Sequence, residues 1–171
     1  MLSGDAVSHF RPDRKVNFME FSGTQTMNAP LENVWAYLFD VNKVAECAPG
    51  FQSLEVLGDE HWKAVISVGV GPVKAKFTLD VSREMQEPEY MMVKGRGKAP
   101  GSAVELIGHM NLAAIDADQT RMDWSAHVIV SGTIASVGAR LLAGTAEKLT
   151  AQFFDCLQTK LHASETAAME G

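Results

Sequence analysis

The sequence predicts an α+β fold of the helix-grip type, in which a curved antiparallel sheet of seven strands wraps around a long C-terminal helix. Between about residues 133 and 161, apolar side chains recur every three or four positions, as on one side of a helix. From about residue 18 to residue 131, short runs alternate apolar and polar residues, as strands do. A helix of roughly 40 Å, at ~1.5 Å per residue, needs a long partner such as one curved sheet.

The first strand and two short helices precede the main part of the sheet. Alternation predicts a strand over residues 18–27. A helix should follow, because Asn28 can cap it and Pro30 suits its first turn. Asp40 is expected to end that helix and to cap a second one, over residues 42–47.

Further strand signals then follow one another up to the final helix. The alternation is clearest in residues 73–82, where every second residue is apolar and the residues between them are Lys, Thr, Asp and Ser. One face of the sheet should therefore be buried and the other solvated. These strands are expected at residues 51–57, 61–70, 73–82, 89–97, 103–114 and 120–130.

The length and composition indicate one soluble globular domain. A chain of 171 residues can bury one substantial core, and we expect a helix-grip domain over residues 18–162 between flexible segments 1–17 and 163–171. The formal charge of -6 argues against nucleic acid as a partner. No secretory signal or membrane-spanning stretch is visible, which predicts a cytoplasmic location, with peripheral association at the inner face of the cell membrane as an alternative.

Two cysteines, Cys47 and Cys156, fall in a loop and on the apolar side of the long helix. This placement favours free thiols in a reducing compartment, and a single disulfide between them stays open. Cys47 lies near the C-terminus of a short helix, which does not favour a thiolate. We therefore expect Cys47 to serve packing or the mouth of a cavity and not nucleophilic catalysis.

No catalytic or metal-binding spacing emerges from the other polar residues. The five histidines form no helix-spaced pair, so no metal site is expected. The run Gly69-Val70-Gly71-Pro72 lacks the Lys-Ser/Thr of a phosphate loop and is interpreted as a turn that presents Val70 outward.

Several segments resemble the CoxG family of carbon monoxide dehydrogenase subunits, over about residues 19–161. The most specific are the run Val68-Gly-Val-Gly-Pro-Val-Lys74 and the turn Cys47-Ala48-Pro49-Gly50. The others are the opening Met19–Pro30, Val34-Trp35, and the closing Gly138–Leu161 with Gly144, Lys148, Leu149 and Gln152-Phe153-Phe154.

This resemblance implies a non-catalytic accessory protein of a molybdenum-containing carbon monoxide dehydrogenase or a related hydroxylase. It implies a cavity for an apolar ligand, a quinone or a lipid, and a part in membrane recruitment of the enzyme or in electron transfer. It implies no covalent cofactor, although a quinone is a candidate for the bound ligand. Some longer relatives carry a C-terminal membrane anchor, whereas residues 162–171 of this chain are polar.

The inward faces of the sheet and helix are where we expect a ligand to bind. Nine methionines occur in the chain, several of them on these faces, and methionine adapts to different apolar shapes. Gln25 or Thr145 could fix a polar head group. The expected ligand-binding residues are Phe77, Leu79, Met91, Leu106, Met110, Met122, Trp124, Leu141, Leu142, Thr145 and Leu149. Those expected at the cavity mouth or at a docking surface are Cys47, Pro49, Gly50, Gly69, Val70, Gly71 and Pro72.

The same inward residues could also close on one another as an ordinary core. Small helix residues, Gly138, Ala143, Gly144 and Ala146, favour open space instead. An alternative function is a cyclase- or hydrolase-like enzyme acting on an apolar substrate in the same cavity. Such an enzyme would need a buried acid/base pair, which the inward faces lack. A third hypothesis is a scaffold that binds the dehydrogenase but no small molecule.

Overall fold

The computed structural model describes residues 16–86 and 89–170, with the backbone alone from residue 164 onward. The predicted flexible segment 1–17 lies outside this description except for its last two residues, which already belong to the first strand. In chain order the elements are β1 (Val16–Met27), α2 (Leu31–Phe39), α3 (Val41–Glu46), β2 (Phe51–Gly58), β3 (His61–Val70), β4 (Val73–Gln86), β5 (Tyr90–Ala99), β6 (Ser102–Asp116), β7 (Gln119–Gly132), the 3-10 helix η1 (Thr133–Val137) and α4 (Ala139–Glu170).

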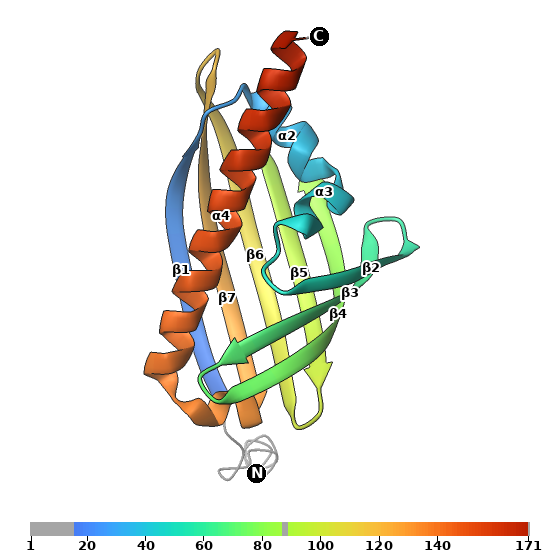
Figure 1. Ribbon diagram of the computed structural model, residues 1–171, viewed down its shortest axis with the longest axis vertical. Coiled ribbons are helices and arrows are strands. Elements are labelled where there is room, and N and C mark those ends of the chain that lie inside the picture. The colour runs from blue at the N-terminus through green and yellow to red at the C-terminus, as the bar shows by residue number, and fades with distance from the viewer. Residues whose placement is uncertain (1–15, 87–88, 171) are drawn as a thin grey trace, which may run out of the picture.

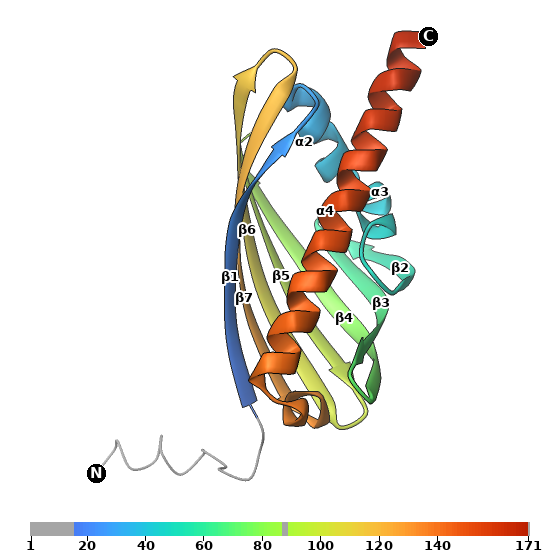
Figure 2. The same ribbon diagram turned by 60° about the vertical axis from the view of Figure 1, so that its left-hand side comes forward.

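The strands form one antiparallel sheet of seven strands in the order β1-β7-β6-β5-β4-β3-β2. Each strand from β2 to β6 pairs with the next one along the chain, and β1 pairs with β7. Figures 1 and 2 show the sheet curving around α4, with α2 and α3 beside the C-terminal half of that helix. The predicted helix-grip fold, with two short helices between its first two strands, is confirmed.

The two short helices are joined at Asp40. Its Oδ1 atom accepts hydrogen bonds from the backbone N–H groups of Asn42 (3.1 Å) and Lys43 (3.4 Å), so Asp40 caps α3 as predicted. The predicted cap of α2 is wrong, because Pro30 occupies that position without a side-chain bond. Asn28 instead accepts a hydrogen bond from Gln119 Nε2 at 3.1 Å, which ties the start of the helical segment to β7.

Tyr37 lies on the buried side of α2. Its hydroxyl donates to the Lys43 backbone oxygen at 3.4 Å. Burial raises the pKa of Tyr37 above its ordinary value of 10.0, and the nearby carboxylates of Glu46 and Asp40 add to the effect. The neutral phenol is therefore the form that the fold favours.

Arg83 fastens α2 to the sheet from an inward-facing position on β4. Its guanidinium donates to the carbonyl oxygens of Leu38 (3.2 Å) and Phe39 (2.9 Å) at the end of α2. The same group pairs with Glu60 in the β2–β3 turn at 2.6 Å and lies over the Trp62 ring. Carbonyl groups at a helix C-terminus are unpaired within the helix, so a buried cation there has a structural role.

The long helix begins later and ends later than the sequence predicted. Residues 133–137 form η1, and Gly138, with φ of +100°, separates it from α4. A positive φ is readily adopted only by glycine, which explains the break. At the other end, residues 163–170 continue α4 where a flexible tail was predicted. They contain no proline or glycine, and alanine, methionine and glutamate favour helix.

Two clusters of buried apolar residues lie between the sheet and α4. The α2 cluster joins α2, the ends of β1 and β7, and the C-terminal half of α4 around buried Met27, Val34, Trp35, Leu38, Met91, Leu112, Met122, Phe154, Leu157 and Leu161. The η1 cluster lies at the end of the molecule where α4 begins, around buried Val70, Phe77, Val130, Ile134, Ala135 and Leu142.

Candidate ligand-binding cavity

A cavity of about 290 Å³ lies inside the η1 cluster, between the sheet and the first turns of α4. Its lining consists of Met19, Ile66, Val68, Val70, Phe77, Leu79, Val81, Val93, Gly95, Val104, Leu106, Val128, Val130, Ile134, Leu142, Thr145, Ala146 and Leu149. Most of these residues are valine or smaller. Short side chains on both the sheet and the helix leave the space open.

The sequence identified part of this lining. Six of the eleven predicted ligand-binding residues surround the cavity, namely Phe77, Leu79, Leu106, Leu142, Thr145 and Leu149. The other five lie elsewhere. Met91, Met110, Met122 and Trp124 belong to or pack on the α2 cluster, while Leu141 is 40% exposed and lies over Gly71 of the β3–β4 turn.

The four residues that pack at the α2 cluster do so because large side chains meet there. Trp124 stacks against Phe154 with ring centroids 5.5 Å apart, and Met122 is fully buried. The prediction correctly assigned these residues to the inward face. The prediction could not show which half of that face side chains would fill. Alternation determines the face of the sheet on which a residue lies, but not which residues of α2 or α4 it meets.

Sequence reasoning did not select the valines that dominate the lining. Val68, Val104, Val128 and Val130 follow the same period-two pattern as the selected residues, so the face was predictable. The preference for Met and aromatic residues as ligand contacts directed attention to the half of the sheet that side chains fill. Short branched side chains were the signal for open space.

Thr145 provides the one polar side chain of the cavity lining. The lining contains no Asp, Glu, His, Lys, Arg, Cys or Tyr, so no side chain there can transfer a proton near neutral pH. Gln25, the other predicted polar contact, is not part of the lining. Among the described residues, the Nε1 donor of Trp124 is buried and has no hydrogen-bond partner. Trp124 packs against Gly23 and Phe154, outside the cavity.

The β3–β4 turn closes one end of the cavity. Val70 points inward and is 2% exposed, so the prediction that it faces outward is wrong. Gly71, with φ of +58°, lies under the Leu141 side chain, and a Cβ atom there would be 2.6 Å from Leu141 Cδ2. Gly69 and Pro72 are exposed. This turn and Leu141 therefore meet at the edge of the cavity.

The other predicted mouth residues lie away from this turn. Gly50 adopts φ of +79° and packs so closely on the Ser67 backbone that a Cβ atom would be 2.0 Å from Ser67 O. Cys47 is 4% exposed and is joined by a disulfide to Cys156 of α4. Cys47 therefore fastens the end of α3 to α4, and Gly50 packs on β3. Cys47, Pro49 and Gly50 do not line the cavity.

The disulfide differs from the free thiols that the sequence favoured. The two Cα atoms are 5.4 Å apart, because the end of α3 lies directly against the inward side of α4. Cys47 therefore has no free thiol for nucleophilic chemistry. A disulfide is typical of oxidising compartments, so the expectation of a reducing compartment loses its basis in the cysteines.

A shallow hollow of about 630 Å³ adjoins the cavity on the outer side of α4. Thr145 lines both spaces. Gly144 lies in the hollow, and a Cβ atom there would have nothing within 4 Å. The sequence suggested that Gly144 either packs closely or opens the cavity, and it does neither. Glycine within a helix nevertheless costs about 1 kcal/mol relative to alanine. Of the small helix residues, Ala146 is the one that lines the cavity.

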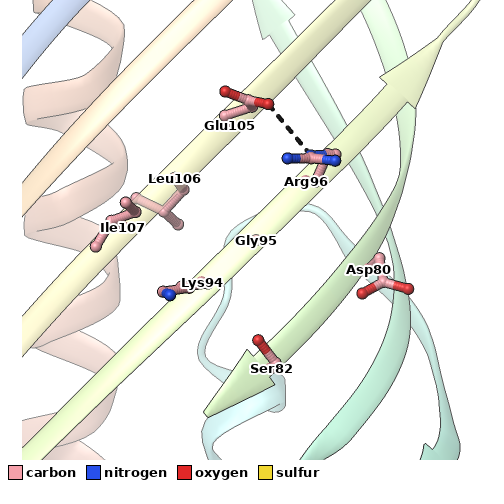
Figure 3. Close-up of a pocket in the computed structure, with 8 residues that line it drawn as sticks. All are labelled: Asp80, Ser82, Lys94, Gly95, Arg96, Glu105, Leu106 and Ile107. Atoms are coloured by element: carbon pink, nitrogen blue, oxygen red, sulfur yellow. Dashed lines mark ion pairs between the residues drawn. The ribbon is translucent and has the colours of Figure 1, made fainter. Parts of the chain in front are cut away.

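Another hollow, of about 520 Å³, lies on the outer face of the sheet over β4, β5 and β6. Figure 3 shows its charged side chains, including the pair formed by Arg96 and Glu105, whose Nε and Oε1 atoms are 3.2 Å apart. Both partners are more than half exposed, so the pair is solvated. This hollow has the polar character of an ordinary outer sheet face.

The described residues contain no group of three or more His, Cys, Asp or Glu side chains placed to hold a metal ion. None of the described helices combines the length and the apolar character that crossing a membrane requires.

The curved sheet around a long C-terminal helix is the START-like helix-grip fold, here with an apolar cavity between the sheet and α4. More narrowly, the chain belongs to the CoxG family of carbon monoxide dehydrogenase subunits, whose model matches residues 23–162. The resemblance seen in the sequence is thus confirmed. A comparison with curated protein sequences gave no match.

Solved structures of the same fold cover most of the chain. A conserved protein from Geobacillus kaustophilus is 26% identical with a TM-score of 0.80, over 85% of this chain and 97% of that one. The Zhui aromatase/cyclase from Streptomyces sp. R1128 is 18% identical with a TM-score of 0.64, over 85% and 94%. A START superfamily protein from Mycobacterium smegmatis is 11% identical with a TM-score of 0.67, over 84% and 97%. The last two likenesses show the fold alone.

Proposed function

We propose that this chain is a non-catalytic accessory protein that binds an apolar ligand in the cavity between the sheet and α4. The observation that supports this most directly is the lining, in which Thr145 provides the one polar side chain. Transfer of apolar surface from water into such a space contributes about 25 cal/mol per Å². The Thr145 hydroxyl can orient a single polar group of the ligand.

The size of the cavity favours a quinone over a diacyl lipid. A volume of about 290 Å³ is near the lower limit of ordinary ligand pockets, roughly 300–1,000 Å³. It has room for one substituted ring and a few methylene groups. Thr145 would then bind a ring oxygen, and an isoprenoid tail would leave past Leu141 at the edge of the cavity.

Membership of the CoxG family supports a molybdenum-containing carbon monoxide dehydrogenase, or a related hydroxylase, as the partner. In this proposal the chain aids membrane recruitment of the enzyme, or accepts its electrons on the bound quinone. No covalent cofactor takes part. The alternative, a cyclase- or hydrolase-like enzyme, draws on the aromatase/cyclase that shares the fold. The cavity does not support this enzymatic alternative, because its lining has no acidic or basic side chain.

Mass spectrometry of an organic extract tests the binding function. Protein purified without detergent should carry a quinone, or should gain thermal stability when decylubiquinone is added. At a free ligand concentration of 100 times the Kd, binding adds about 2.7 kcal/mol to the free energy of unfolding. An empty extract together with an unchanged melting temperature would contradict the proposal.

Two phenylalanine substitutions on α4 locate the ligand. Ala146 lines the cavity, whereas Ala151 is exposed to solvent on the same helix. Ala146→Phe should therefore abolish ligand loading, and Ala151→Phe should leave it unchanged. Equal loading of both variants would place the ligand outside the cavity.

The proposed place of action is the cytoplasm, at the inner face of the membrane. The disulfide between Cys47 and Cys156 makes this testable, because disulfides persist in oxidising compartments and are rare in the cytosol. Alkylation of thiols in intact cells should trap both cysteines as free thiols if the protein is cytoplasmic. Recovery of the intact disulfide would contradict that location.

A further inference from the structure

The end of the molecule where α4 begins carries five exposed cations without an ion-pair partner among the described residues. Lys74 and Lys76 follow the β3–β4 turn, Lys98 precedes the β5–β6 turn, and Arg140 and Lys148 lie in the first turns of α4. These five residues are called the basic end. The turns converge there, since Thr133 N donates to Gly101 O at 2.8 Å and Leu141 covers Gly71. Figures 1 and 2 show these two turns and the start of α4 at the same end of the molecule.

Acidic residues gather at the opposite end of the molecule. Asp116 and Asp118 occupy the β6–β7 turn, Glu84 and Glu89 flank the β4–β5 turn, and Glu32 begins α2. A chain with a formal charge of -6 thus concentrates positive charge at one end. Such a separation orients a protein toward an anionic surface, basic end first.

Of the described acidic residues, two lie near the basic end, and neither neutralises it. Glu105 pairs with Arg96, which is not one of the five cations. Glu147 is exposed on α4 beside Lys148 and makes no ion pair with a described residue. Among the described residues, five cations at this end therefore compare with one unpaired carboxylate.

The hollow over Gly144 lies within the basic end. Arg140, Gly144 and Lys148 are one helical turn apart and share a face of α4, so two cations flank an exposed glycine. A Cβ atom at Gly144 would have nothing within 4 Å, so no contact with a described residue explains an unfavourable helix residue there. A glycine of this kind lets another molecule approach the backbone closely.

This hollow adjoins the mouth of the cavity. Thr145 borders both spaces, and Leu141, at 40% exposed, lies between the hollow and the β3–β4 turn. A molecule seated over Gly144 would therefore touch the residues past which a ligand enters or leaves.

We propose that the basic end is the docking surface for an acidic face of a protein partner. A side chain or short segment of the partner fills the hollow over Gly144, and carboxylates of the partner face Arg140 and Lys148, which line it. The hollow combines apolar residues with two flanking cations, so a protein partner can fill it with an apolar side chain while neighbouring carboxylates pair with Arg140 and Lys148. The identity of the partner as the dehydrogenase rests on the proposed function, and docking in this orientation would place its surface at the cavity mouth.

Charge reversal at the basic end tests this docking surface. The probe is the purified carbon monoxide dehydrogenase holoenzyme of the source organism, passed over the immobilised chain at several salt concentrations. The double variant Arg140→Glu/Lys148→Glu should bind it about tenfold or more weakly, and wild-type binding should weaken as salt increases. The matched control Lys43→Glu/Lys63→Glu changes the net charge equally but alters exposed lysines away from the basic end, and it should bind like wild type.

A third variant separates docking from folding. Gly144→Gln replaces glycine with a better helix former and fills the hollow, so it should raise the melting temperature while weakening docking. Equal binding by all variants, or no binding by the wild type, would overturn the proposal. It would also be overturned if the basic-end variants bound the holoenzyme normally but lost binding to vesicles of equal parts phosphatidylglycerol and phosphatidylcholine, since the surface would then be a membrane site.

The same preparations distinguish this inference from the proposed function. Organic extracts of the basic-end variants should contain as much quinone as extracts of the wild type, because none of the substituted side chains lines the cavity. Loaded extracts with unaffected docking would refute the docking surface alone. Empty extracts with charge-dependent docking would refute the ligand-binding function alone.

Discussion

Gly95 offers a direct test of whether the cavity is open in solution. It lies on the inward face of β5 and lines the cavity, and a Cβ atom there would meet Leu106 Cβ at 4.0 Å, an ordinary contact. The substitution Gly95→Leu therefore projects a branched apolar side chain into the empty space without displacing a neighbour.

The expected gain in stability has two parts. Burial of a leucine side chain contributes about 1.5–3 kcal/mol. Replacement of a glycine inside a strand removes a further penalty of roughly 0.5–1 kcal/mol. The sum of about 2–4 kcal/mol corresponds to a rise in melting temperature of roughly 4–16 °C, at ~2–4 °C per kcal/mol for a chain of this size.

Thermal unfolding followed by circular dichroism measures this gain, and ligand loading is measured on the same samples. Gly95→Leu should be more stable than ligand-free wild type and should no longer bind quinone. The matched control is Gly69→Leu on the exposed side of β3, where a Cβ atom would have nothing within 4 Å. A melting temperature for Gly95→Leu at or below that of Gly69→Leu would refute an open cavity, because the added side chain would then lack space.

Three further predictions concern stability. Gly97→Ala should lower the melting temperature, because its Cβ atom would lie 2.9 Å from Cγ1 of the short, branched Val104 as well as 2.3 Å from Leu79 Cδ2. Reduction of the Cys47–Cys156 disulfide, which spans 109 residues, should lower the free energy of unfolding by about 2–4 kcal/mol, as measured by urea unfolding with and without reductant. Burial raises the pKa of Tyr37 from 10.0, so its contribution to stability is fully present below that pH and is lost as pH rises through the higher folded-state pKa. Absorbance at alkaline pH should show this late titration in the wild type and not in Tyr37→Phe.

The sequence determines the faces of the sheet well because alternation is a local property. Val73, Phe77 and Leu79 alternate with charged and hydroxyl residues, and pairing with neighbouring strands preserves that alternation across the sheet. The final helix was equally clear from its spacing. Its start was missed because the sequence does not show that Gly138 adopts a positive φ.

The location of the open space could not be predicted in the same way. It depends on which inward residues lie opposite one another once α4 crosses the sheet. Phe154 meets Trp124 and fills one half, whereas Ala146 and Thr145 meet valines and Gly95 in the other half. This pairing is a tertiary property, and no period within one strand or one helix contains it.

The disulfide illustrates the same limit. Cys47 and Cys156 are 109 residues apart, and their pairing requires the end of α3 to lie against α4. The sequence placed Cys156 correctly on the apolar side of the helix. It provided no signal for where along α4 the end of α3 would pack, so the sequence favoured two free thiols where the structure has one disulfide.

The arrangement of filled and open halves has a consequence for function. The α2 cluster, Arg83 and the disulfide all join α2 and α3 to the sheet and to α4, so that half of the molecule is held rigidly together. The half with the cavity contains η1 and the glycine-bounded start of α4. Movement that admits a ligand should therefore occur at Gly138 and Leu141, next to the basic end, and a partner docked there can control it.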